Sequence, residues 1–193
     1  MTSISCSIGA KTALNRFVAQ AMEANDADSG GAVSSRAIER YKTLASGGWG
    51  IIVVEALSVT QQSMARRHGM IINEKNLDGF KRLVQAVKTI HPDCVLLFQI
   101  THAGQNSNPG FSEKVRICPQ GPADARYLSS DEIERIADLF VNAALLAHRA
   151  GADGVDFKMC HGYFGAEMLR PANTRDDKWG GPFKQNTVPE EMR

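Results

Sequence analysis

Four reactive side chains fall within six positions of the stretch DGVDFKMCHGYFGAEML, residues 153–169: Lys158, Cys160, His161 and Tyr163. They follow a short apolar run, DGVDF, which is typical of a buried strand. Lysine, histidine and tyrosine can each donate a hydrogen bond to a developing oxyanion, and tyrosine can also deliver a proton. The pattern therefore predicts, at the end of a strand, a site that holds a substrate oxyanion and supplies a proton.

Each of these residues has a second interpretation. Lys158 could form a Schiff base with a carbonyl substrate, as in aldolase-like enzymes, if desolvation kept its amine neutral. Cys160 is expected to be a small buried filler, because most buried cysteines are inert. His161 and His102 lie in loops near glycine, where a lone histidine usually caps or packs. The spacing of Lys158, His161 and Tyr163 favours oxyanion binding over the Schiff base.

The other predicted strands end in the residues Ala21, Met22 and Glu23; Glu55 and Ala56; and Gln99, Thr101 and His102. Ligands of parallel α/β folds bind at the C-terminal ends of strands, so these residues are expected to share one site. Met22 is expected to pack. A buried Glu55 must be paired and could cap a neighbouring loop, and a buried Gln99 needs hydrogen-bond partners. The set lacks metal-ligand spacing, so no metal is predicted.

The elements that must position these residues are alternating apolar runs and amphipathic segments. We predict strands at residues 16–22, 50–56, 94–100 and 153–157, and helices at residues 34–48, 76–90 and 129–152. The run GIIVVEA is apolar on both faces, which indicates a parallel sheet covered by helices. The segment 101–128 is rich in glycine, proline, asparagine and serine, and its length predicts a functional loop.

Capping signals support this order of helices. Ser34 or Ser35 can cap the first helix, and Gly47 is expected to be the left-handed residue that ends it. Ser129 and Glu132 form a capping box at the start of the third helix. The residues expected in the core are Ile38, Tyr41, Leu44 and Ala45; Phe80, Leu83, Val84 and Val87; and Ile133, Ile136, Ala137, Phe140, Ala144 and Leu145.

Four β/α units in succession predict a parallel α/β fold, either doubly wound or a barrel. No glycine-rich turn follows the first strand, which weakens the dinucleotide-binding doubly wound version. A complete eight-unit barrel usually needs ~250 residues. Four strands in 193 residues would form half of one.

The composition limits the expected partners and compartment. The net charge is +1, which gives no electrostatic reason to expect nucleic acid or an anionic membrane as a partner. No apolar run approaches the ~20 residues of a membrane span, and the N-terminus lacks an apolar signal-peptide core. The four scattered cysteines are typical of reduced thiols. We therefore expect a cytoplasmic protein.

Five stretches together resemble one family. NRFVAQAM, RYKTLASGGWGIIVVEALSV, FQITHAGQ, GADGVDFKMCHGYFGAEML and NTRDDKWGG occur in this order between residues 15 and 181. The succession of HAGQ, HGYF and R-x-x-x-W-G-G is similar to the old yellow enzyme family of FMN-dependent oxidoreductases. The resemblance implies an α/β fold of the (β/α)8 TIM-barrel type with only about the first four β/α units present. Residues 1–193 would then be the N-terminal half of a truncated FMN-binding barrel domain.

The resemblance also implies a cofactor, FMN, and a reductant, NADH or NADPH. Lys158 and His161 correspond to the donor pair that holds a substrate carbonyl, and Tyr163 corresponds to the proton donor of many alkene reductases. The implied reaction transfers hydride through the flavin to an electron-poor alkene of the enone or enoate type. The positions that would contact the cofactor are Ala21, Met22, Glu23, Ala56 and Gln99.

Departures from the family pattern modify these expectations. Lys158 replaces the usual histidine, which suggests a substrate bearing a carboxylate. Glu23, if ionised, would be electrostatically unfavourable beside a flavin carbonyl. The resemblance fades at Pro182, before the strands whose loops bind cofactor phosphate in barrel enzymes. The alternatives are a Schiff-base lyase using Lys158 and a non-enzymatic half-barrel that needs a partner chain, either a second copy or a missing C-terminal half.

Overall fold

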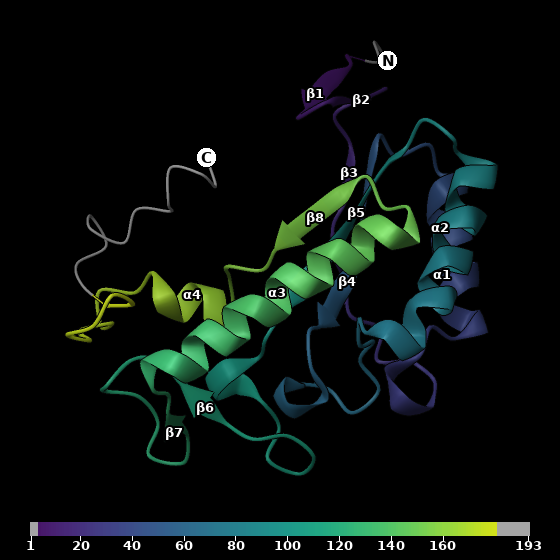
Figure 1. Ribbon diagram of the computed structural model, residues 1–193. Coiled ribbons are helices and arrows are strands. Elements are labelled where there is room, and N and C mark those ends of the chain that lie inside the picture. Colours follow the sequence, from purple (N-terminus) through teal and green to yellow (C-terminus); the bar gives the residue numbers. More distant parts are fainter. Residues whose placement is uncertain (1–3, 181–193) are drawn as a thin grey trace.

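The computed structural model describes residues 4–180, in which four parallel strands form a sheet flanked by three long helices (Figure 1). The strands pair in the order β3-β4-β5-β8 and every neighbouring pair is parallel. A helix connects each strand to the next, so the predicted α/β class is confirmed. The strands are β3 (Val18–Ala19), β4 (Ile51–Ser58), β5 (Val95–Thr101) and β8 (Gly154–Phe157), and the helices are α1 (Ser35–Ser46), α2 (Leu77–Ile90) and α3 (Ser130–Ala150).

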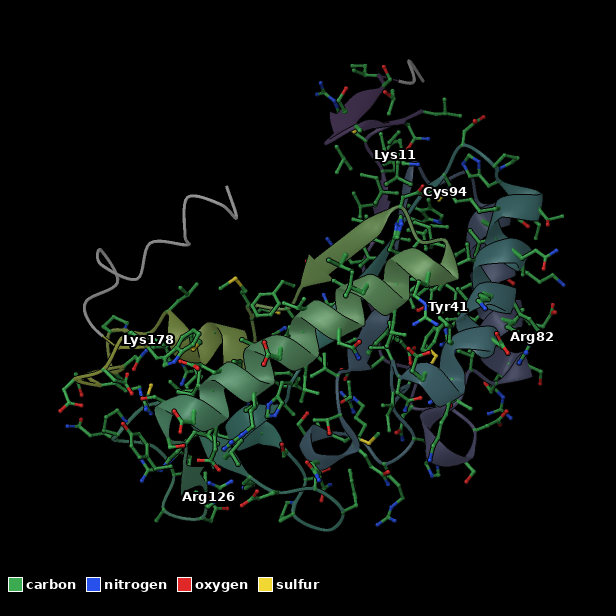
Figure 2. The ribbon with its side chains drawn as sticks, viewed as in Figure 1. Lys11, Tyr41, Arg82, Cys94, Arg126 and Lys178 are labelled. Carbon is green, nitrogen blue, oxygen red and sulfur yellow. The ribbon has the colours of Figure 1, made fainter. Side chains whose placement is uncertain are left out.

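Short elements lie at the two ends of this sheet. The hairpin of β1 (Cys6–Ile8) and β2 (Lys11–Ala13) projects from one end in Figure 1. Its Lys11, labelled in Figure 2, pairs with Asp153 at 2.9 Å, just before β8 begins, so the hairpin lies at the N-terminal end of the strands. The other short elements are β6 (Val115–Arg116), β7 (Arg126–Tyr127), α4 (Phe164–Met168) and the 3-10 turns Ser29–Gly31, Gln61–Ser63, Glu74–Asn76 and Gly104–Asn106.

Both faces of β4 and β5 are buried, as their continuous apolar runs predict. The prediction of a buried strand at residues 153–157 is wrong, because β8 has β5 as its one neighbouring strand within residues 4–180 and is partly exposed. On the helix side, Ile52 and Val54 of β4 pack with Leu96 and Phe98 of β5 and with the helices. On the opposite face, a second cluster consists of Ala13, Ile51, Val53 and Val95. The hairpin residue Ala13 belongs to this inner-face cluster, so the hairpin covers the N-terminal end of the inner face. The C-terminal end is left to loops.

The start of α1 agrees with the sequence, whereas its end does not. The Ser34 side chain accepts a hydrogen bond from the Ala37 amide, as the predicted cap requires. The prediction that Gly47 is left-handed is wrong, because Gly47 has φ −78° and Gly48 has φ +71°. The Gly47 amide bonds back to the Leu44 carbonyl at 2.9 Å, which tightens the last turn and moves the chain reversal one residue on.

The buried stripe of α3 also departs from the prediction. The capping box of Ser129 and Glu132 is confirmed, and Phe140 is buried, but Leu145 is 58% exposed. Leu145 lies five residues after Phe140, about 140° around a helix of 3.6 residues per turn. The stripe instead continues at spacings of three and four, through Ala143, Leu146, Ala147 and Ala150.

The free edge of the sheet is apolar. In residues 4–180, β8 pairs with β5 alone. Val155 and Phe157 of β8 are 39% and 38% exposed, and Val141 lies exposed beside Leu145 on the outer face of α3. We call these four residues the β8 edge patch.

The first predicted strand, residues 16–22, is largely wrong, because only Val18–Ala19 pairs with β4. The chain beyond these two residues leaves the sheet, since the Ala24 amide binds the Glu55 carboxylate at 3.1 Å. No helix in residues 4–180 is long and apolar enough to cross a membrane.

Candidate functional site

Residues from the first and fourth β/α units meet at the C-terminal edge of the sheet. Lys158 directly follows β8 and is only 6% exposed. Its ammonium nitrogen lies 3.3 Å from Glu23 Oε1 and 4.2 Å from the centre of the Tyr163 ring. A buried cation held by a carboxylate and an aromatic face is well placed to bind an anionic or electron-rich group that replaces one of these contacts.

A left-handed turn brings Tyr163 back over Lys158. The Lys158 amide donates to the Ile100 carbonyl at 3.1 Å, which continues the sheet register. His161 (φ 57°) and Gly162 (φ 69°) then reverse the chain. The side-chain amide of Asn106 donates to the Gly162 carbonyl at 2.8 Å and stabilises this turn.

His161 itself is exposed and sits beside Tyr163, with the two ring centres 6.4 Å apart. Tyr163 therefore lies between Lys158 and His161, and all three predicted catalytic residues are brought to one place.

Arg66 joins this site from the loop that follows β4. Its Nε lies 2.5 Å from Glu23 Oε2, so the single carboxylate of Glu23 is shared by two cations, Arg66 and Lys158. We call Arg66, Glu23 and Lys158 the charged triad. Sequence reasoning missed Arg66, and its only signal was the adjacent pair Arg66–Arg67 in a loop after a strand end.

The pKa of Tyr163 is raised above its ordinary value. Burial is the largest cause, the negative charge of Glu23 adds to it, and the positive charge of Arg66 partly offsets it. Its phenol is therefore protonated at neutral pH, as a proton donor must be.

A β-bulge at the end of β4 places Glu55 on the same side of the sheet as Val54, whereas a regular strand would put these neighbours on opposite faces. The register with β5 shifts between Val54 and Leu57, so one extra residue is accommodated on β4. Glu55 points to α1, where Arg40 Nη2 lies 2.7 Å from its carboxylate. Ala56 instead lines a cavity at the strand ends.

Glu55 anchors the loop after β3. Only 1% of the residue is exposed, and burial raises the pKa of its carboxyl, an effect opposed by the Ala24 amide and by Arg40. Its own amide donates to the hydroxyl oxygen of Tyr41, on α1 in Figure 2, at 2.7 Å. The predicted pairing is thus confirmed, and so is the capping of a neighbouring loop.

The cavity that Ala56 lines has a volume of about 20 Å³, room for roughly one water molecule. Glu23, Arg66 and Tyr163 border it on one side. Thr101, from the end of β5, also lines it, and its buried hydroxyl has no hydrogen-bond partner among residues 4–180. This orphaned hydroxyl marks a point where a bound group could form a hydrogen bond.

The remaining predicted cofactor residues have different environments. Ala21 packs against the inner-face cluster. Met22 is 79% exposed, so the expectation that it packs is wrong, because the chain leaves the sheet before it. Gln99 is buried, and its amide donates to Asp156 Oδ2 of the neighbouring strand at 2.7 Å.

His102 and Cys160 both have structural explanations. The His102 Nδ1 accepts a hydrogen bond from the Gly104 amide at 3.2 Å, and its ring packs on Phe164 with centres 5.1 Å apart. Burial lowers the pKa of His102 to about 4, so the ring is neutral at pH 7. Cys160 is exposed, contrary to prediction, because it lies at the outward bend before the left-handed turn. Among residues 4–180, no group of three or more His, Cys, Asp or Glu side chains is placed to hold a metal ion.

The long segment 101–128 is tied to the site by Glu167 of α4. One oxygen of its buried carboxylate accepts hydrogen bonds from the amides of Ile117 and Cys118, at 2.9 and 3.0 Å. The segment contains β6 and β7 and ordered turns, so it is a folded cover rather than an unstructured loop.

Sequence comparison places this geometry in context. The sequence model of the NADH:flavin oxidoreductase / NADH oxidase family matches residues 6–186. An NADH oxidase of Thermoanaerobacter brockii is 32% identical over 188 residues, which cover 92% of this chain and 29% of that protein. An NADPH dehydrogenase of Clostridium acetobutylicum is 29% identical over 179 residues, covering 90% of this chain and 52% of that protein.

Solved structures have the same fold. A 2-naphthoyl-CoA reductase in complex with 2-naphthoyl-CoA superposes with a TM-score of 0.85 at 26% identity, over 94% of this chain and 30% of that one. The old yellow enzyme homologue from Zymomonas mobilis gives a TM-score of 0.82 at 24% identity, over 94% and 55%.

The predicted barrel-type fold is therefore confirmed, with the chain spanning between about a third and about half of the length of these relatives. Because the family model matches nearly the whole sequence, including the segments that carry Glu23, Lys158 and Tyr163, the chain belongs to the NADH:flavin oxidoreductase / NADH oxidase family.

Proposed function

We propose that this chain provides the N-terminal half of an FMN-binding barrel in an oxidoreductase that reduces electron-poor alkenes, with NADH or NADPH as reductant. The family uses FMN with NAD(P)H. The observation that carries the proposal is the contact of Lys158 with Glu23 and Tyr163 at the C-terminal end of β8. Barrel enzymes bind their substrates at this end of the strands.

The residues at this edge fit a flat aromatic cofactor lying across the strand ends. Ala56 has a small side chain, which allows close approach of a ring. Met22 offers an exposed apolar side chain, and Gln99 offers a polar amide on the inner face. Ala21, Met22, Glu23, Ala56 and Gln99 would hold the flavin. When bound, FMN supplies the hydride that it takes from NAD(P)H.

The side chains of the chain itself perform binding and proton transfer. Lys158 and His161 hold the carbonyl or carboxylate oxygen of the substrate, where negative charge builds as the β-carbon accepts hydride. Tyr163 gives its phenolic proton to the α-carbon and regains one from solvent. The alkene thereby gains one hydride and one proton, which balances the reduction.

Gln99→Ala is expected to weaken FMN retention about tenfold without unfolding the protein, because one hydrogen bond to a polar ring edge is lost. The FMN dissociation constant, measured by quenching of flavin fluorescence, gives the result. Gln85→Ala, on the exposed side of α2, is the matched control and should leave the constant unchanged. An unchanged constant for Gln99→Ala would mean that Gln99 serves only its partner Asp156.

A Schiff-base reaction at Lys158 is not favoured, since the family transfers electrons and the ammonium is engaged by Glu23. Borohydride treatment with 3-penten-2-one, followed by peptide mass spectrometry, is expected to leave Lys158 unlabelled. A labelled Lys158 would establish the lyase chemistry instead.

We also propose that further barrel strands cover the β8 edge patch, whose four apolar residues are exposed in the described part of the chain. They would come from a C-terminal half of the barrel or from a second copy. A non-enzymatic half-barrel that acts only through a partner would use the same edge but would not bind FMN. Light scattering gives the mass of the protein in solution and so shows whether a second copy is bound. An FMN titration then shows whether the assembly binds the cofactor, which a non-enzymatic half-barrel would not.

A further inference from the structure

The charged triad contains two cations, Arg66 and Lys158, but only one carboxylate, that of Glu23. The Glu23 carboxylate is the shared counterion of Arg66 and Lys158, at 2.5 Å and 3.3 Å. The side chain of Lys158 is 5% exposed, that of Glu23 is 17% exposed, and that of Arg66 is 53% exposed. Within residues 4–180, Glu23 is the one carboxylate paired with Lys158, and because Glu23 is shared with Arg66, Lys158 can accept another anion.

The backbone around the charged triad is held without the help of Glu23. The Ala27 amide donates to the His68 carbonyl at 2.9 Å, and the His68 amide donates to Asn25 Oδ1 at 2.8 Å. These bonds join the segment after β3 to the loop that carries Arg66. The Glu23 side chain can therefore leave its two partners while the loop that carries Arg66 stays joined to the segment after β3.

Two cations would stabilise the negative charge that forms in the proposed reaction when the substrate is a carboxylate. Hydride addition to the β-carbon of an enone places one negative charge on a carbonyl oxygen, which neutral donors can stabilise. The same addition to an enoate, which is already an anion, places two negative charges on the carboxyl oxygens. Two cations in a partly desolvated site lower the cost of this dianion, because Coulomb attraction strengthens where water is excluded.

The cavity beside the charged triad supplies an independent observation. Thr101 lines it together with Glu23, Arg66 and Tyr163. Its buried hydroxyl has no hydrogen-bond partner in the described part of the chain. Departure of the Glu23 side chain, which borders the cavity, would enlarge this space for a carboxylate bound by Arg66, with Thr101 on its border. The donors that surround the cavity are thus suited to an acceptor-only group.

We infer that the substrate of this site carries a carboxylate, which displaces Glu23 as the counterion of Arg66 and Lys158. The inference rests on the proposed function, to which it adds the substrate class and two specificity-determining residues. Arg66 binds the carboxylate from the solvent side, and Glu23 occupies its place until the substrate arrives.

Isothermal titration calorimetry of the FMN-loaded protein, without reductant, tests this inference. The two probes are trans-2-butenoate and trans-3-penten-2-one, which have the same alkene and differ in charge. Wild type is expected to bind the butenoate at least about tenfold more tightly than the ketone, as a charge-assisted hydrogen bond predicts. Arg66→Gln should lower the affinity for the butenoate about tenfold and leave the affinity for the ketone unchanged. Glu23→Gln should bind the butenoate several-fold more tightly than wild type does.

Arg67→Gln is the matched control, because Arg67 is the next residue and stacks over the Phe111 ring at 5.0 Å instead of facing Glu23. It should bind both probes as wild type does. Arg66→Lys retains the charge and should keep most of the affinity, which guards against misfolding of Arg66→Gln. Equal wild-type affinities, absence of binding, or weaker butenoate binding by Glu23→Gln would overturn the inference.

The failure of the inference is distinguishable from the failure of the proposed function. Reduction of the ketone by NAD(P)H without any preference for the carboxylate would overturn the inference and leave the function standing. Tighter binding of the butenoate than of the ketone, in a protein whose flavin does not turn over, would support the inference and overturn the proposed function.

Discussion

Replacing Tyr163 with phenylalanine is expected to slow alkene reduction by about 100-fold, the lower end of what a positioned general acid contributes. Flavin reduction by NADH or NADPH should be unchanged, because that half-reaction needs no proton from Tyr163. The aromatic ring remains in the variant, so the contact with the Lys158 ammonium at 4.2 Å is retained. The loss is thus confined to the phenolic proton.

Stopped-flow measurement of the two half-reactions separates these effects. Tyr127→Phe is the control, since Tyr127 is 40% exposed and its ring stacks on Arg116 and Arg175 away from the site. Equal losses in both half-reactions of Tyr163→Phe would contradict the proton-donor role. The raised pKa of Tyr163 adds a pH signature: the phenol stays protonated, and alkene reduction persists, beyond the ordinary tyrosine range near pH 10.

Acidification from pH 6.5 to pH 4 is expected to remove about 3 kcal/mol from the free energy of unfolding through His102 alone. Burial lowers the pKa of His102 from 6.5 to about 4 in the folded chain. Between these values the unfolded chain binds a proton on this ring and the folded chain does not, so stability falls as the pH falls. Above pH 6.5 the ring is neutral in both states and contributes no pH dependence.

His102→Asn isolates this contribution. Asparagine can still accept the hydrogen bond from the amide two residues on, which Gly104 now donates to His102 Nδ1, but it does not titrate. Urea unfolding of wild type and variant at pH 7 and pH 4.5 gives the difference. The variant should lose less stability on acidification, whereas the control His148→Asn, on an exposed part of α3, should follow wild type. Identical profiles for wild type and His102→Asn would contradict the prediction.

The strands and helices were predictable where burial acts on whole faces. The run from Ile51 to Val54 is apolar at every position, and only a strand buried on both sides requires that pattern. Phe80 and Val87 of α2 repeat at helical spacing and are fully buried. The first strand was overestimated, because only Val18–Ala19 pairs with β4 and the Ala24 amide bonds to the side chain of the distant Glu55.

The candidate site was predictable only in its strand-end residues. Lys158 and Tyr163 are close in sequence, so local spacing indicates their convergence. The partner of Lys158, Glu23, is 135 residues away, and Arg66 comes from an irregular loop with no periodic pattern. The position of Glu55 on the helix side of the sheet depends on a β-bulge, whose position is set by pairing between strands and not by either strand alone.

The visible absorption spectrum of the purified protein, titrated with FMN and read with its mass in solution, tests the central claim most directly. A flavin site at the C-terminal edge of the sheet predicts a saturable perturbation of the flavin band and a yellow protein after gel filtration. Gln99→Ala should require about tenfold more FMN for the same change. A spectrum that remains that of free FMN at every concentration, with a colourless protein after filtration, would contradict the account.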